Sequence, residues 1–163
     1  MARRVFFSFH YERDICRASQ IRNSWITKPD RETAGFWVAA SCEEVKKKGK
    51  ETIKRWIDNQ LNGTSVTLVL IGAETNESKW VSYEIQKSYQ IGNGMLGIYN
   101  RNMKDQYGRT YYKGKNPFYN WSITRNTQKI LLSSLYRTYD WVSDNRYKNL
   151  VDWVEKAAKD AGR

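Results

Sequence analysis

The residue best placed to do chemistry in this chain is a glutamate on the apolar side of a predicted helix. Segment 79–90 has helical spacing, and Glu84 shares a stripe with apolar or small neighbours: Trp80, Val81, Ile85 and Ser88. A carboxylate that faces a covered surface costs several kcal/mol unless it is paired or used. A surface pair with Lys87 is one explanation, worth only a few tenths of a kcal/mol. A position in a functional crevice is the other.

One carboxylate can do useful chemistry without a metal, a Cys–His pair or a Ser–His–Asp triad. It can stabilise an oxocarbenium-like centre or hold a ribose hydroxyl during glycosidic cleavage. Nicotinamide in NAD is a good leaving group because the ring nitrogen that forms its glycosidic bond is already positively charged. Positioning and one negative charge could therefore be enough for cleavage. The helical stripe is compatible with NAD cleavage but does not by itself single out this substrate.

The segments that must position Glu84 alternate between strand-like and helix-like patterns. Strands are predicted at residues 4–9, 35–40, 65–72, 95–99 and 130–135. Helices are predicted at residues 15–25, 79–90 and 145–161. Another helix is predicted to begin at a cap formed by Ser41 and Glu44 and to end at Asn62. This alternation predicts an α/β fold, a central parallel sheet of about five strands with helices on both faces. Because ligands of such folds bind at the carboxyl edge of the sheet, Glu84 is expected to face a crevice there.

The chain reads as one domain over residues 1–163, with a long polar and aromatic insertion at about residues 100–129. Its formal net charge is +11, but its densest lysine run, residues 46–50, is interpreted mainly as the solvated start of a helix rather than a nucleic-acid site. No apolar run approaches the roughly 18 residues of a membrane span. We therefore expect a cytoplasmic protein with no nucleic-acid or membrane partner, and one histidine with two cysteines predicts no metal site.

Several sequence motifs resemble TIR domains. The first strand and its loop, VFFSFHYERD at residues 5–14, are similar to the first TIR box, and WVSYEI at residues 80–85 is similar to the segment that carries the catalytic glutamate of NAD-cleaving members. Further motifs are TSVTLVLIG at residues 64–72, KNPF at residues 115–118 and YRTYDWV at residues 136–142. Together they resemble the TIR-like subunit of the Thoeris anti-phage system over nearly the whole chain.

This resemblance implies a flavodoxin-like fold and an NAD+ glycohydrolase or cyclase activated by an unknown phage trigger. Such an enzyme needs no cofactor: it cleaves its substrate NAD+ to nicotinamide and a cyclic ADP-ribose isomer, which signals to a separate effector protein. Glu84 would be the catalytic carboxylate. The loop after the first strand would border the nucleotide and two aromatic residues would wall the crevice, which makes the substrate-binding candidates Phe9, His10, Tyr11, Trp80 and Tyr83.

Other readings of these residues stay open. His10 could contact a phosphate or ribose, or could be an ordinary polar loop residue. Asn116 could bind a ribose hydroxyl or the nicotinamide carboxamide, but an Asn before Pro also simply starts a turn. Aromatic residues of the long insertion could stack on a purine or pin the loop to the body. They are Tyr107, Tyr111, Tyr112, Tyr119 and Trp121.

Two alternatives to an enzyme are also open. The first is a TIR interaction module that catalyses nothing and acts through TIR–TIR contacts. The second, a flavin- or phosphate-binding regulator, is disfavoured because no glycine-rich phosphate loop follows the first strand. Glu84 and a nicotinamide-release assay discriminate between an enzyme and an interaction module.

Overall fold

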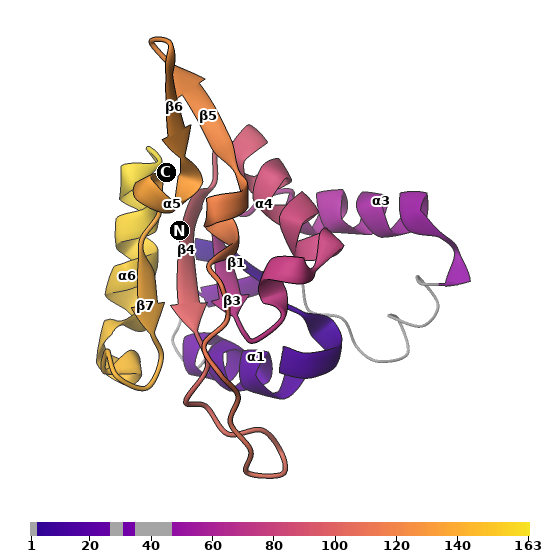
Figure 1. The fold of residues 1–163 in the computed structure, drawn as a ribbon, viewed down its shortest axis with the longest axis vertical. Helices are drawn as coiled ribbons and strands as arrows, with labels where there is room; N and C mark the ends of the chain where they lie inside the picture. The colour runs from indigo at the N-terminus through magenta and orange to yellow at the C-terminus, as the bar shows by residue number, and fades with distance from the viewer. Residues whose placement is uncertain (1–2, 27–30, 35–46) are drawn as a thin grey trace.

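The computed structural model describes residues 3–26, 31–34 and 47–163. Its centre is a parallel sheet of five strands in the order β2-β1-β3-β4-β7 (Figure 1). The strands are β1 (Arg3–Ser8), β2 (Arg31–Ala34), β3 (Val66–Ile71), β4 (Gly94–Tyr99) and β7 (Thr138–Asp140). The buried β-branched run of β3 lies between β1 and β4, which confirms that it is a central strand.

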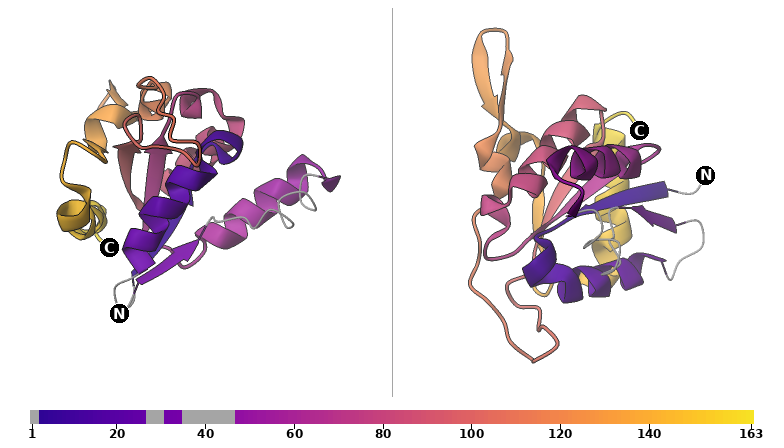
Figure 2. Two further views of the ribbon diagram at one scale, coloured as in Figure 1. Left: turned by 90° about the horizontal axis from the view of Figure 1, so that it is seen from below. Right: turned by 90° about the vertical axis from the view of Figure 1, so that its right-hand side faces the viewer.

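Helices cover both faces of the sheet, as expected (Figure 2). One face carries α1 (Tyr11–Ile26) and α6 (Arg146–Asp160), whose apolar residues join a single large core cluster. The opposite face carries α3 (Lys50–Leu61) and α4 (Lys79–Gln90), which pack over two smaller clusters. The α/β architecture predicted from the alternating segments is therefore confirmed.

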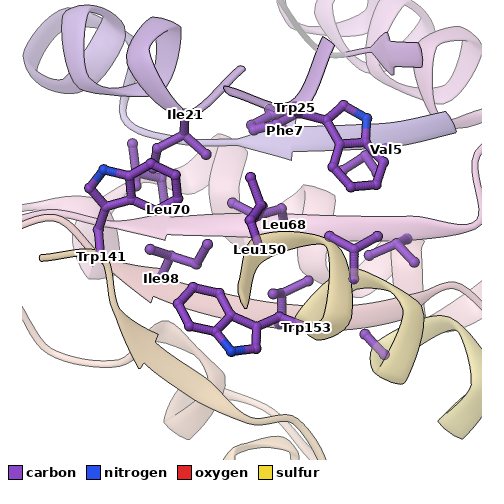
Figure 3. Close-up of a cluster of buried hydrophobic side chains, with 14 of the residues drawn as sticks. Val5, Phe7, Ile21, Trp25, Leu68, Leu70, Ile98, Trp141, Leu150 and Trp153 are labelled. Carbon is purple, nitrogen blue, oxygen red and sulfur yellow. The ribbon is translucent and has the colours of Figure 1, made fainter. Parts of the chain in front are cut away.

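The alternation of side chains along β1 decides which residues can reach each face. Val5, Phe7 and Phe9 belong to the large cluster under α1 and α6, part of which is drawn in Figure 3. Phe6, one residue out of phase, packs with α3 on the opposite face. Ser8 has the same parity as Phe6, so its side chain lies on the side of the sheet that α4 covers, where it contacts that helix.

One of the expected strands differs from the structure, and another lies outside the described residues. The strand predicted at residues 35–40 and the cap predicted at Ser41 and Glu44 lie outside the described residues, and the described strand that pairs with β1 at this edge is β2. The strand predicted at residues 130–135 is wrong, because this stretch divides between β6 (Gln128–Leu131) and the short helix α5 (Leu132–Leu135). Leu132 and Leu135 have helical spacing and both pack on the cluster beneath α4, which favours a helical turn there.

The expected insertion contains ordered structure of its own. It includes the 3₁₀ turn η2 (Pro117–Asn120) and the strand β5 (Ser122–Arg125), which pairs with β6 in an antiparallel hairpin. Figure 1 shows this hairpin at the amino edge of the sheet, opposite the long loop that follows β4. Asn126 and Thr127 form its turn, both with positive φ, as a tight two-residue hairpin requires. Among the described residues, no helix has the length and apolar character to cross a membrane.

Candidate active site

Helix α4 presents Glu84 to the interior of the molecule. The helix follows the 3₁₀ turn η1 (Thr75–Glu77) and begins at Ser78, whose hydroxyl accepts a hydrogen bond from the Val81 amide at 3.3 Å. Only 6 % of Glu84 is exposed, and it lies on the buried stripe of α4 with Val81, Ile85 and Ser88. The predicted placement of this carboxylate on a covered face is thus confirmed.

The hydrogen-bond partner of Glu84 comes from the neighbouring strand. The Ser8 hydroxyl, on the last residue of β1, donates a buried hydrogen bond to Glu84 Oε2. Burial raises the pKa of Glu84 from 4.5 to about 8, and the hydrogen bond from Ser8 opposes this rise without cancelling it. Lys87 does not supply the missing positive charge, because its ammonium group lies 4.0 Å from Asp58. The carboxyl group is therefore mostly protonated in the free protein at neutral pH.

Trp80 and Tyr83 lie on the side of α4 that faces α3. Their rings meet edge to face, with centroids 6.5 Å apart, and both pack against the cluster that includes Phe6. The Tyr83 hydroxyl donates a 2.9 Å hydrogen bond to Asp58 of α3. Burial and this carboxylate together raise the pKa of Tyr83 to about 12, so its phenol stays neutral. These contacts hold the turn of α4 that carries Glu84 against α3.

Of the three candidates that follow β1, two pack on the large core cluster. Phe9 belongs to the large core cluster, and Tyr11 packs against the same cluster with its ring 6.3 Å from that of Phe9. The structure therefore does not bring these two side chains to Glu84, because strand alternation directs Phe9 to the opposite face. His10, between them, is half-buried, and its Nδ1 atom is buried with no hydrogen-bond partner among the described residues.

Asn116 lies at the start of η2, where it stabilises a turn. Its Oδ1 atom accepts a 3.0 Å hydrogen bond from the Phe118 amide, and only 8 % of the residue is exposed. Two residues earlier the chain passes so close to Gly72, at the end of β3, that a Cβ on Gly114 would overlap the Gly72 carbonyl. This part of the loop is thus held tightly at the carboxyl edge of the sheet.

The aromatic residues of the insertion fall into two groups: some are exposed to solvent, and others pack against the rest of the domain. Tyr107, Tyr112 and Tyr119 are exposed. Tyr111 lies beneath two guanidinium groups of α1, with the carbon of Arg17 4.7 Å from its ring centre. Trp121 packs against the cluster under α4. Tyr111 and Trp121 therefore fasten the insertion to the body.

Two features of this edge were not predicted from the sequence. The first is Ser8 as the partner of Glu84. The second is a buried polar cluster in which Asp14 accepts hydrogen bonds from Asn100 at 2.9 Å and from Arg17 at 3.4 Å. Arg17 also donates to the backbone carbonyls of Met103 and Arg109, at 3.0 and 2.9 Å, and so ties the loop after β4 to α1. Burial raises the pKa of Asp14 despite these partners.

Comparisons with known proteins agree with this architecture. Residues 6–105, which include the end of β1, all of β2 to β4 and both Ser8 and Glu84, match the family model described as "Thoeris protein ThsB, TIR-like domain". The chain is also 38 % identical over 191 aligned residues to a protein of Bacillus cereus (strain MSX-D12) named "Putative cyclic ADP-D-ribose synthase ThsB1". That alignment covers 94 % of this chain and 100 % of the relative. The chain therefore belongs to the Thoeris ThsB family of TIR-like domain proteins.

Proposed function

We propose that this protein is a cyclic ADP-ribose synthase that uses NAD+ as its substrate and Glu84 as its catalytic carboxylate. The observation that carries the proposal is the buried Glu84, a carboxyl group with a raised pKa whose hydrogen-bond partner is Ser8 at the carboxyl end of β1. Perturbed carboxyl groups of this kind are characteristic of functional sites. The name of the Bacillus cereus relative, aligned over its full length, supports the same reaction.

The proposed reaction needs one electrostatic contribution from the protein. The glycosidic bond between C1′ of the ribose and the nicotinamide nitrogen breaks, and its electron pair leaves with nicotinamide. The ionised Glu84 stabilises the positive charge that develops on the ribose. A nitrogen or hydroxyl of the adenosine half then forms the new bond to C1′ and releases a proton. NAD+ is thereby converted to nicotinamide, a cyclic ADP-ribose isomer and a proton.

Substrate binding itself favours the active ionisation state of Glu84. A pKa of about 8 leaves roughly a tenth of the free protein ionised at pH 7. The cationic nicotinamide ring of NAD+ beside this carboxyl group lowers its pKa, because an opposite charge favours the charged form. The hydrogen bond from Ser8 acts in the same direction and fixes the orientation of Oε2. Ser8 is thus a positioning residue for Glu84.

The remaining candidates form the surroundings of this centre. Trp80 and Tyr83 supply an apolar wall next to Glu84, supported by their packing with α3. We infer that His10 borders the nucleotide, while Phe9 and Tyr11 contribute by fixing the loop on the core. Asn116 holds the second loop at the same edge. Exclusion of water by these loops would favour cyclisation over hydrolysis, since a nucleophile held close has a large effective concentration.

We further propose that the cyclic product signals to a separate effector protein and that phage infection triggers its synthesis. Membership of a family named for the Thoeris system supports this role. A direct test combines the purified protein with NAD+ and lysate from infected or uninfected cells, followed by mass spectrometry of the nucleotides. Addition of the products to the effector then shows whether they are active.

Glu84→Gln tests the catalytic assignment because it keeps the size of the side chain and removes its charge. Nicotinamide release should fall more than ~100-fold if the carboxylate is the main electrostatic contribution. The matched control is Glu77→Gln, which removes an exposed carboxylate from η1, a few residues away. Activity of Glu84→Gln within a few-fold of wild type would overturn the assignment. Absence of nicotinamide release from an activated wild-type protein would instead favour a TIR interaction module.

A further inference from the structure

A cavity lies away from Glu84, at the amino edge of the sheet. It has a volume of about 720 Å³ and is bounded by α6, the end of α4, the start of β4 and the segment from β5 through α5 to β7. In Figure 1 this region lies between α6 and the base of the β5–β6 hairpin. The volume is in the range of sites that bind small organic ligands.

The cavity is located where the sheet is incomplete. Strand β7 pairs with Gly97 to Tyr99, and among the residues that the structure describes no strand pairs with the first half of β4 on this side. The Gly97 amide donates to the Arg137 carbonyl at 2.9 Å, and the Tyr99 carbonyl accepts from Trp141 at 3.1 Å. Alternate residues of a strand direct their backbone groups to the same side. The amide and carbonyl of Met95 therefore face the cavity and offer one donor beside one acceptor.

Aromatic rings form much of the wall around this backbone edge. Tyr139 stacks on Trp153, with ring centroids 4.2 Å apart and planes 10° from parallel. Tyr89 and Tyr136 contribute from the other side. Burial, with Tyr89 nearby, raises the pKa of Tyr136 to about 12, so its hydroxyl remains a neutral donor. A flat heterocycle can contact these rings and reach the Met95 edge at the same time.

Positive charge gathers at the same cavity. Arg125 from β5, Arg137 before β7 and Lys156 from α6 all line it, whereas Asp160 contributes one opposing charge and pairs with Lys156 at 2.9 Å. Within the described part of the chain neither arginine forms an ion pair. Two guanidinium groups are thus available to bind phosphate oxygens, a role that suits their planar donor geometry.

We propose that this cavity binds a purine nucleotide, with its base on the Met95 backbone edge and its phosphates on Arg125 and Arg137. The site is separate from the proposed catalytic centre, although Tyr89 and Glu84 belong to the same helix. An acidic peptide added as a strand beside β4 fits less well. The segment that ends at Arg137 already borders this gap, and the Arg137 carbonyl already pairs with Gly97.

Calorimetric titrations with ADP, AMP and inorganic phosphate test the proposal, together with the backbone amide signal of Met95 in nitrogen-edited NMR spectra. Arg125→Ala/Arg137→Ala should weaken ADP binding at least tenfold. The matched control is Lys129→Ala/Lys159→Ala, which removes two exposed cations that do not line the cavity, and it should change ADP affinity less than twofold. ADP should shift the Met95 amide in the wild type and in Glu84→Gln.

Ser134→Trp provides a second test because it keeps every charge and fills part of the cavity. It should abolish ADP binding, and it decides the matter if the double arginine variant fails to fold. Unchanged ADP affinity in either folded variant, or a Met95 amide that ADP does not move, would overturn the proposal. Equal affinity for phosphate and ADP would show only an anion patch. Binding of acidic peptides in place of nucleotides would also refute it.

Discussion

Replacement of the buried Glu84 by glutamine should make the folded protein more stable, and the gain should grow with pH. The physical reason is the raised pKa of this group, about 8 in the folded state against an ordinary value of 4.5. Below pH 4.5 the carboxyl group is protonated in both folded and unfolded chains. Between pH 4.5 and about 8 the unfolded chain loses this proton while the folded chain retains it, so the wild type loses stability as pH rises.

The size of the effect follows from the two pKa values. One pKa unit corresponds to 1.36 kcal/mol, so the interval from 4.5 to about 8 sets an upper limit of roughly 5 kcal/mol. Relaxation of the protein and water penetration around a buried charge reduce this cost. We therefore compare the free energies of unfolding of Glu84→Gln and wild type at two pH values. The advantage of the variant should be about 1 to 3 kcal/mol larger at pH 8 than at pH 4.5. For a domain of this size that corresponds to roughly 2 to 12 °C in Tm.

Chemical denaturation of wild type and Glu84→Gln at intervals from pH 4.5 to 9 measures this difference directly. Other titrating groups contribute equally to both proteins and largely cancel. Glu77→Gln, at an exposed carboxylate, should not reproduce the gain. A constant difference between wild type and Glu84→Gln across this pH range would refute the reasoning, because it would show that Glu84 ionises with the same pKa in the folded and unfolded states.

Three further predictions concern the same edge of the sheet. The Ser8 hydrogen bond stabilises the ionised form of Glu84, so its removal in Ser8→Ala should raise the pKa of this group. The rising limb of kcat/KM, expected near pH 8, should then move to higher pH in a pH–rate profile. Asn116→Ala should cost about 1 kcal/mol of stability, measured by thermal denaturation, whereas Asn116→Asp keeps the capping oxygen and should cost less. Arg17→Met should destabilise the fold by about 3 kcal/mol because it leaves Asp14 buried without its cation, and denaturant titration should show partial recovery when Asp14→Asn is added.

The position of Glu84 was predictable because a charge on an apolar stripe conflicts with a simple pattern. Its partner Ser8 was predictable in principle, since it shares the parity of Phe6 in a strand buried along most of its length. The same alternation assigns Phe9 to the opposite face. The polar loop after β1 was recognised from the sequence. Its polarity alone does not show which of its side chains lie near Glu84 and which pack on the core.

The carboxyl-terminal part of the sheet was harder to predict for physical reasons. Strand β7 has only three residues and pairs along one edge, so its alternation is too short to stand out. The run at residues 130–135 is the more apolar stretch, but its leucines belong to a hairpin strand and a helical turn that cover α4. The hairpin turn at Asn126 and Thr127 lacks the glycine that usually marks such turns. Tertiary contacts decide the structure of this segment.

A largely protonated Glu84 also bears on how the proposed enzyme releases its products. The free site carries little negative charge at neutral pH, so ionisation of Glu84 depends on the positive nicotinamide ring of NAD+. After the glycosidic bond breaks, nicotinamide leaves as a neutral molecule and the ADP-ribose part retains only its negative phosphates. The carboxylate then loses the charge that stabilised it and takes up a proton again. Because neither product supplies that cation, the same desolvation that makes Glu84 costly for the fold weakens binding of the products and favours their release.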